Sequence, residues 1–118
     1  MAKTQLKPDQ INNSYSTTAE QLTGETWING KPIYKRTVAA TGPISVATST
    51  FAHGITGIDQ PVKLDGFWTN PNTVDFPYYF SATNWTSARF DATNLIINLG
   101  TERQGTGSFA LTLYYTKV

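Results

Sequence analysis

The stretch that decides the fold is Thr26-Trp27-Ile28-Asn29-Gly30-Lys31-Pro32-Ile33-Tyr34-Lys35-Arg36. Asn29-Gly30 is a strong β-hairpin signal, because both residues tolerate the positive φ angles of a two-residue turn. Thr-Trp-Ile precedes the pair. After Lys-Pro, an apolar run begins at Ile33 and continues through Tyr34 to Val38. The stretch therefore predicts a strand, a tight turn and a second strand.

Outward from this hairpin, short apolar runs alternate with turn residues. The second hairpin strand should end at Thr41-Gly42-Pro43, where glycine and proline interrupt it. Further strands are expected at residues 44–52, 62–68 (with Gly66 as a bulge), 76–80, 88–91, 94–99 and 108–115. Residues 69–73 form a turn cluster and residues 100–107 a glycine-rich hairpin loop. The pattern predicts an all-β chain, a small antiparallel β-sandwich of about eight strands.

One buried face and one edge position can be assigned within this pattern. In the last strand Phe109, Leu111, Leu113 and Tyr115 share one side, as expected for a half-buried strand. In the strand at residues 76–80, Pro77 favours an edge position, because proline donates no ladder hydrogen bond.

Composition bounds the architecture and excludes several kinds of site. With 118 residues the chain has room for one core. Charged residues make up 14% of the chain and the net charge is +1, which argues against electrostatic binding of nucleic acid. No cysteine is present, so disulfides, zinc-thiolate sites and cysteine nucleophiles are excluded. No apolar run has the ~20 residues that a membrane-spanning helix needs, and no membrane insertion is expected.

The chain divides into two parts by composition. Residues 1–22 are polar and contain too few apolar side chains to fold alone, so a polar arm or linker is expected there. Residues 23–118 carry the β signals and form the sandwich head domain.

Catalytic motifs are scarce. His53 is the single histidine, the eight acidic residues are scattered, and no Gly-x-Ser-x-Gly elbow or calcium-binding loop occurs. The chain is therefore expected not to be an enzyme, and to need no cofactor or metal. For His53 the preferred interpretation is a hydrogen bond within a loop. The alternative is a metal site formed by three copies on the axis of a trimer.

Aromatic residues give the better candidate site. An aromatic ring can stack on the apolar face of a sugar while neighbouring polar side chains bind its hydroxyls. Residues 67–91 interleave these residue types, and the candidate ligand-binding residues are Trp85, Tyr79, Tyr78, Asn84, Arg89 and Asp75. Trp85 is equally compatible with a core position, and Trp27 and Trp68 favour core or intersubunit packing.

Three phrases of the sequence carry a resemblance to a known family. They are the Trp-Ile-Asn-Gly-Lys-Pro-Ile-Tyr phrase within residues 26–36, Phe51-Ala52-His53-Gly54-Ile55 with Ile58-Asp59, and Leu111-Thr112-Leu113-Tyr114-Tyr115-Thr116-Lys117. These three phrases resemble sequences in the C-terminal receptor-binding head domains of bacteriophage and prophage tail-fibre or baseplate proteins.

The resemblance implies a homotrimer at the tip of a virion tail, joined to other tail proteins on its N-terminal side. It implies synthesis in the host cytoplasm and action outside cells, where the head binds a host cell-surface receptor such as a saccharide. The alternative is a structural or trimerisation module of the virion tail that binds no receptor. A polysaccharide hydrolase is a third hypothesis, but it requires a pair of carboxyl groups in a cleft.

Overall fold

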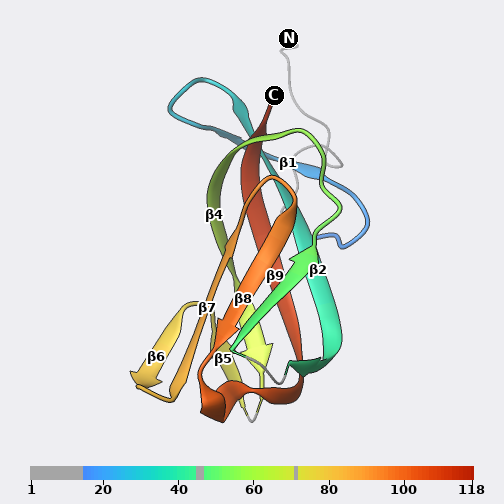
Figure 1. The fold of residues 1–118 in the computed structure, drawn as a ribbon. Helices are drawn as coiled ribbons and strands as arrows, with labels where there is room; N and C mark the ends of the chain where they lie inside the picture. Colours follow the sequence, from blue (N-terminus) through green and yellow to red (C-terminus); the bar gives the residue numbers. More distant parts are fainter. Residues whose placement is uncertain (1–14, 45–46, 71) are drawn as a thin grey trace.

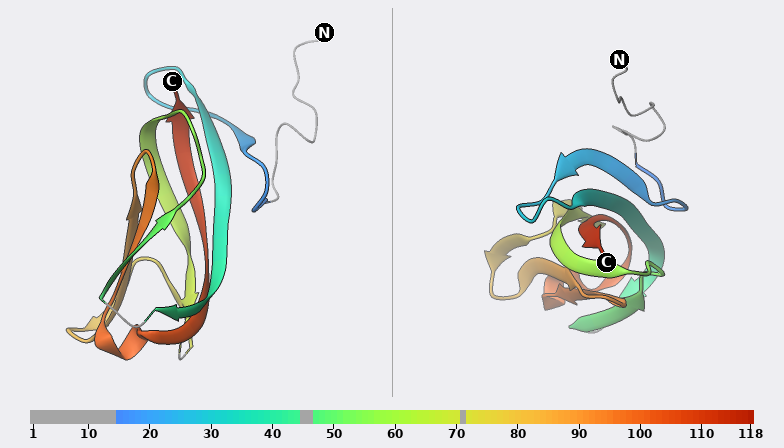
Figure 2. Two further views of the ribbon diagram at one scale, coloured as in Figure 1. Left: turned by 45° about the vertical axis from the view of Figure 1, so that its right-hand side comes forward. Right: turned by 90° about the horizontal axis from the view of Figure 1, so that it is seen from above.

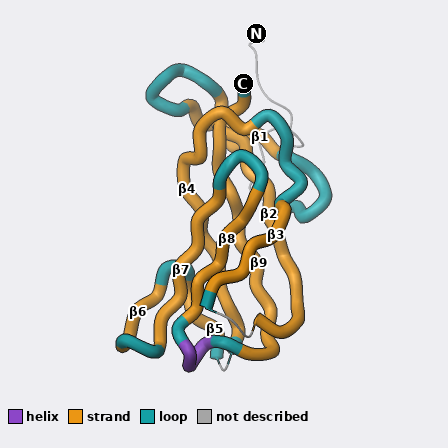
Figure 3. Tube along the Cα trace, in the orientation of Figure 1, coloured by secondary structure: helices purple, strands orange, loops and turns teal. Residues whose placement is uncertain are grey.

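The computed structural model describes residues 15–44, 47–70 and 72–118, and these form two antiparallel β-sheets packed on one another (Figures 1 and 3). Sheet A contains, in order across the sheet, β1 (Gln21–Thr26), β2 (Pro32–Ile44), β9 (Gly105–Lys117), β4 (Ile58–Thr69) and β5 (Thr73–Asp75). Sheet B contains β3 (Thr48–Ala52), β8 (Asn94–Leu99), β7 (Asn84–Phe90) and β6 (Tyr78–Ser81). The expected antiparallel sandwich is confirmed. No helix in the described segments has the length and apolar character to cross a membrane.

The last strand, β9, is the centre of the fold. It pairs with β2 on one side and β4 on the other. Sheet A curls around it, so that the end view in Figure 2 shows the C-terminus enclosed by β2 and β4. The inward residues of β9 are all buried, namely Phe109, Leu111, Leu113 and Tyr115. The face predicted for this strand is therefore confirmed.

Sheet B supplies the other half of the core. Leu95, Ile97 and Leu99 of β8 point inward with Phe90 of β7. Trp68 of β4 is fully buried between the sheets, and its indole N–H donates to the carbonyl of Arg103 at 2.7 Å. Trp68 is therefore a core residue within one chain, and its buried indole N–H has a hydrogen-bond partner.

The predicted β1–β2 hairpin is present, but its turn differs from the expected one. Gly30 has φ +86°, whereas Asn29 has a negative φ and accepts the N–H of Lys31 on its side-chain oxygen. Trp27 and Lys31 close a three-residue loop. Ile28 thus belongs to the loop, where it is 91% exposed, and Trp27 is the closing residue just beyond the end of β1. A type I turn followed by a left-handed glycine accounts for this geometry.

Three of the predicted strand ends, bulges and loops are wrong. β2 continues through residues 41–43 to Ile44, because it is the edge of sheet A beyond the end of β1, and an edge tolerates proline. Gly66 pairs in regular register with Leu111, and the irregularities of β4 lie between Ile58 and Lys63. Residues 100–107 do not form a hairpin loop, since β8 and β9 belong to different sheets. A single 3-10 turn, η1 (Thr101–Arg103), joins them.

Residues 15–20 lie against sheet A. The carbonyl of Ser16 accepts the N–H of Thr37, and Glu20 binds both Tyr115 Oη at 2.5 Å and Lys117 Nζ at 2.8 Å. Burial, with the Glu20 carboxylate beside it, raises the pKa of Tyr115 above its usual range. β1 begins at Gln21, so the described end of the expected arm is continuous with the sheet. Residues 1–14 of that arm lie outside the described residues.

Candidate functional site

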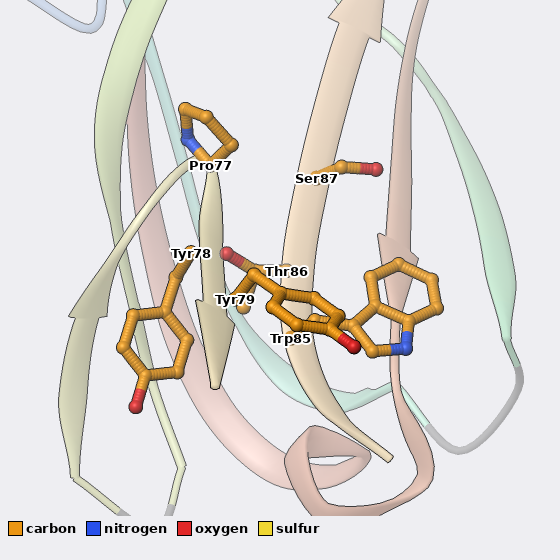
Figure 4. A pocket seen from close by; sticks show the side chains of 6 residues that line it. All are labelled: Pro77, Tyr78, Tyr79, Trp85, Thr86 and Ser87. Atoms are coloured by element: carbon orange, nitrogen blue, oxygen red, sulfur yellow. The ribbon is translucent and has the colours of Figure 1, made fainter. Parts of the chain in front are cut away.

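A shallow groove lies on the β6–β7 hairpin at the edge of sheet B (Figure 4). It encloses about 360 Å³ and is lined by Pro77, Tyr78, Tyr79, Trp85, Thr86 and Ser87. Tyr79 is 73% exposed, and Figure 4 shows its ring reaching across β7 toward the indole of Trp85, while Tyr78 points to the other side of β6. The groove therefore presents aromatic surface to solvent. We call it the aromatic groove.

Strand alternation explains why these rings meet. Thr86 and Phe90 of β7 are buried, so Trp85, Ser87 and Arg89 point outward. Tyr79 is the direct cross-strand partner of Trp85. Side chains of such a pair lie about 5 Å apart at their Cβ atoms. The two rings are thus neighbours on the outer face by register.

Glycine at position 100 makes room for the indole of Trp85. The N–H of Gly100 donates to the carbonyl of Trp85 at 3.0 Å. A Cβ added to Gly100 would lie 2.8 Å from Trp85 Cδ1 and 2.5 Å from the carbonyl oxygen of Thr83. The indole N–H donates to the carbonyl of Ala82 at 3.2 Å. These contacts hold the ring against the backbone and leave it half-buried.

The tip of the hairpin is tied to η1. The N–H of Glu102 donates to the carbonyl of Thr83 at 2.9 Å, and the hydroxyl of Thr83 donates to the carboxylate of Glu102. Arg103 Nε donates to Asn84 Oδ1 at 2.7 Å. These bonds to Thr83 and Asn84, where the turn meets β7, restrain the hairpin relative to the body of the sandwich.

Arg103 joins the segments around the groove by hydrogen bonds. It was not among the candidate residues predicted from the sequence. The side chain is 4% exposed, and its Nη1 donates to the carbonyls of Asn70 and Asn72, both at 3.2 Å. Its guanidinium carbon lies 5.1 Å from the ring centre of Tyr78. One buried cation therefore joins the β4–β5 turn, the β6–β7 hairpin and η1.

The candidate residues divide into two groups. Tyr79, Trp85 and Tyr78 line the aromatic groove. Asn84 does not line it, and its amide oxygen accepts a hydrogen bond from Arg103. Asp75 is on β5 of the other sheet, where its backbone carbonyl accepts the hydroxyl of Thr86 at 2.6 Å. Arg89 is outward on β7 but four residues beyond Trp85.

Two residues of this face were missed from the sequence. Ser87 lies opposite Asn98 of β8, whose side-chain oxygen accepts the hydroxyl of Thr48 at 2.7 Å. Among the described residues, the amide N–H groups of Asn98 have no hydrogen-bond acceptor, so they remain available as donors. The sequence feature that could have identified Ser87 is the alternation Trp85-x-Ser87-x-Arg89. This alternation is lost when the strand is predicted to begin at residue 88.

His53 is a structural residue of the β3–β4 crossover. The N–H of Ile55 donates to Nδ1 at 3.1 Å, so Nδ1 carries no proton and Nε2 donates to the carbonyl of Asp91 at 2.8 Å. Both ring nitrogens are occupied, which confirms the hydrogen-bonding interpretation. The backbone N–H groups of Thr93 and Asn94 lower the pKa of Asp91, whose carboxylate caps the β7–β8 turn.

The aromatic groove has the chemistry of a binding surface. Its six lining residues include no carboxyl group, imidazole or amine. They offer ring faces, the hydroxyl of Ser87 and the phenol of Tyr79. Across the segments that the structure describes, no three His, Cys, Asp or Glu side chains gather to hold a metal ion.

Comparisons of the chain with protein-family models, with curated proteins and with solved structures gave no match.

Proposed function

We propose that this chain is the tip domain of a phage tail-fibre or baseplate protein, and that it binds a saccharide receptor on the host cell surface. The ligand stacks on Tyr79 and Trp85 in the aromatic groove. The domain acts as a homotrimer on the virion tail, outside the cell, with other tail proteins on its N-terminal side.

One observation carries the proposal: two aromatic rings lie side by side on the outer face of a restrained hairpin. A singly exposed aromatic residue is normal, but Tyr79 is 73% exposed and adjoins the half-buried Trp85, and this adjoining pair of rings supports a partner outside the chain. The apolar face of a pyranose ring matches such a surface. Ser87 lines the groove beside the rings, and Asn98 is its cross-strand partner; both can bind hydroxyl groups.

A shallow groove suits a multivalent protein. A single stacked sugar gives weak binding, because few atoms are removed from water. Three linked copies raise the effective concentration of the second and third sites, so the avidity exceeds the affinity of one site by several orders of magnitude. A small domain without a deep pocket is then sufficient for attachment.

The matched variants for a binding test are Tyr79→Ala and Phe80→Ala. Both residues are 73% exposed neighbours on β6, but only Tyr79 lines the aromatic groove. On a glycan array, and with whole host cells, we expect Tyr79→Ala and Trp85→Ala each to weaken binding about 30-fold, the effect of losing an interface anchor worth about 2 kcal/mol. Phe80→Ala should retain wild-type binding. Thermal unfolding monitors the integrity of all three variants.

Equal binding by Tyr79→Ala and wild type would exclude this site. Absence of any glycan or cell binding by the wild type would exclude the function.

A second candidate function, a trimerisation module without a receptor, is favoured by the outer face of sheet A. Ala39, Ala110 and Phe67 form one row across β2, β9 and β4, and Phe67 is 39% exposed. Two adjoining hollows of about 440 and 300 Å³ share Phe67 and Ala110. Small side chains allow close approach of another chain. This face is the surface that we propose for contact between copies.

The substitution Ala39→Lys tests the contact. Ala39 is exposed, so the change should leave the monomer folded while placing a charge in the interface. Light scattering at several concentrations should give the mass of three chains for wild type and of one chain for the variant. A monomeric wild type would refute the trimer. A trimeric wild type that binds neither glycans nor host cells would favour the purely structural function.

A further inference from the structure

We infer that the outer face of sheet B binds an extended, acidic glycan, with one sugar unit on the aromatic groove and an anionic group of a later unit on Arg89. This inference rests on the proposed function and specifies its ligand. The anionic group is a carboxylate or a phosphate, which a guanidinium recognises by the same fork of N–H donors.

Register aligns the three outward residues of β7. Trp85, Ser87 and Arg89 follow one another at every second position. With a strand rise of about 3.3 Å per residue, Trp85 and Arg89 are about 13 Å apart. This separation exceeds one sugar ring. A glycan that stacks on Trp85 therefore reaches Arg89 only with its second or third unit.

Strand register places Arg89 beside a covered apolar residue. Ile96 is the direct partner of Arg89 on β8 and points outward, yet it is only 7% exposed. Arg89 and Thr50 flank it on the neighbouring strands and are positioned to cover it. An arginine whose stem lies over an apolar neighbour keeps its charged end in water. Arg89 is exposed and has no hydrogen bond or ion pair within the described part of the chain.

Of the described residues, Arg89 is the cation that this face presents. It borders a hollow of about 230 Å³ that it shares with Lys63. Lys63 is turned away, with its ammonium 4.6 Å from the ring centre of Tyr114 on sheet A. The carboxylate of Asp91 is occupied by the N–H groups of the β7–β8 turn. An anion arriving along β7 thus meets one unpaired guanidinium.

Ser87 and Asn98 fill the space between the two ends. They are cross-strand partners in the row between Trp85 and Arg89. The hydroxyl of Ser87 and the amide N–H groups of Asn98 suit the hydroxyl or acetamido groups of a middle sugar unit. The face therefore runs from aromatic to neutral polar to cationic along one strand.

The experiment compares matched glycans on one array. One arm uses oligosaccharides containing uronic or sialic acid beside their carboxyl-reduced forms, and the other uses phosphate-bearing glycans beside their dephosphorylated forms. The proteins are wild type, Arg89→Gln, Tyr79→Ala and Lys31→Gln. Lys31 pairs with Asp59 at the surface, away from the groove, so Lys31→Gln removes the same charge as a control.

We expect wild type to prefer the acidic form in one arm, and that arm identifies the anion. Arg89→Gln should bind the acidic form about tenfold more weakly and the neutral form unchanged, because one charge-assisted contact is lost. Lys31→Gln should behave as wild type. Equal binding of acidic and neutral forms, or no effect of Arg89→Gln, overturns the inference even when Tyr79→Ala abolishes binding. No binding of the wild type to any glycan or host cell overturns the proposed function itself, and binding that is unchanged in Tyr79→Ala overturns the proposed site.

Discussion

Replacing Gly66 with alanine should lower the free energy of unfolding by about 3 kcal/mol or more, and it is the most damaging single methyl group that we expect in this chain. A Cβ at this position would lie 2.0 Å from the carbonyl oxygen of Ala110 and 2.8 Å from the Cα of Leu111. Both atoms belong to the backbone of β9. Because β9 is paired on both sides, it cannot move away without disturbing β2. Urea unfolding followed by tryptophan fluorescence measures the loss.

The matched control is Gly54→Ala. Gly54 has φ +74°, but nothing lies within 4 Å of its added Cβ. The substitution therefore imposes backbone strain alone and should cost about 1 kcal/mol. Similar losses for the two variants would show that the approach of β4 to β9 at Gly66 is not as close as described.

The fold class followed from local signals because those signals are strong in this chain. The hairpin at Asn29-Gly30 and the alternation of Phe109, Leu111 and Leu113 depend on neighbouring residues only, so they can be recognised in a single sequence. The pairing of β9 with both β2 and β4 joins residues far apart in the chain. Nothing local specifies that pairing, and the expected hairpin at residues 100–107 was wrong for this reason.

The role of Gly66 shows the same limit. A glycine inside a strand indicates either a bulge or a close approach of another backbone. The sequence does not distinguish these, and the bulge was the wrong choice. Only the position of Ala110 across the ladder shows that close approach is the cause.

The candidate site was predicted in part. Tyr79 and Trp85 were identified by residue type and line one groove in the structure. Asn84 and Asp75 were chosen on the same grounds. In the fold, however, Asn84 accepts a hydrogen bond from Arg103, and Asp75 lies on the other sheet. Residue type indicates what a side chain can bind. Strand register decides which side chains share a face, and register was not available from the sequence.

The second large effect is expected at Arg103. Arg103→Met keeps much of the buried stem but removes the donors to Asn70, Asn72 and Asn84. A fully buried acceptor left without a partner costs about 1–3 kcal/mol, and because these three bonds are part-buried we expect a total loss near 3 kcal/mol. Arg103→Lys retains the charge but has one nitrogen for three acceptors, and it should recover less than half of the loss. Arg89→Gln, at an exposed arginine, should change the stability by less than about 0.5 kcal/mol.

The consequence of the Arg103 substitutions should reach the aromatic groove. Asn84 precedes Trp85 on β7, and Tyr78 lies under the guanidinium. Loss of the cation therefore releases both strands of the hairpin, and hydrogen exchange should accelerate at residues 78–86 before it does in β9. A double-mutant cycle with Asn84→Ala separates this local effect from a general loss of stability. The pair should cost less than the sum of the single variants, because they remove one shared hydrogen bond. Strict additivity would mean that Arg103 stabilises the β4–β5 turn alone and leaves the hairpin to be held by Glu102.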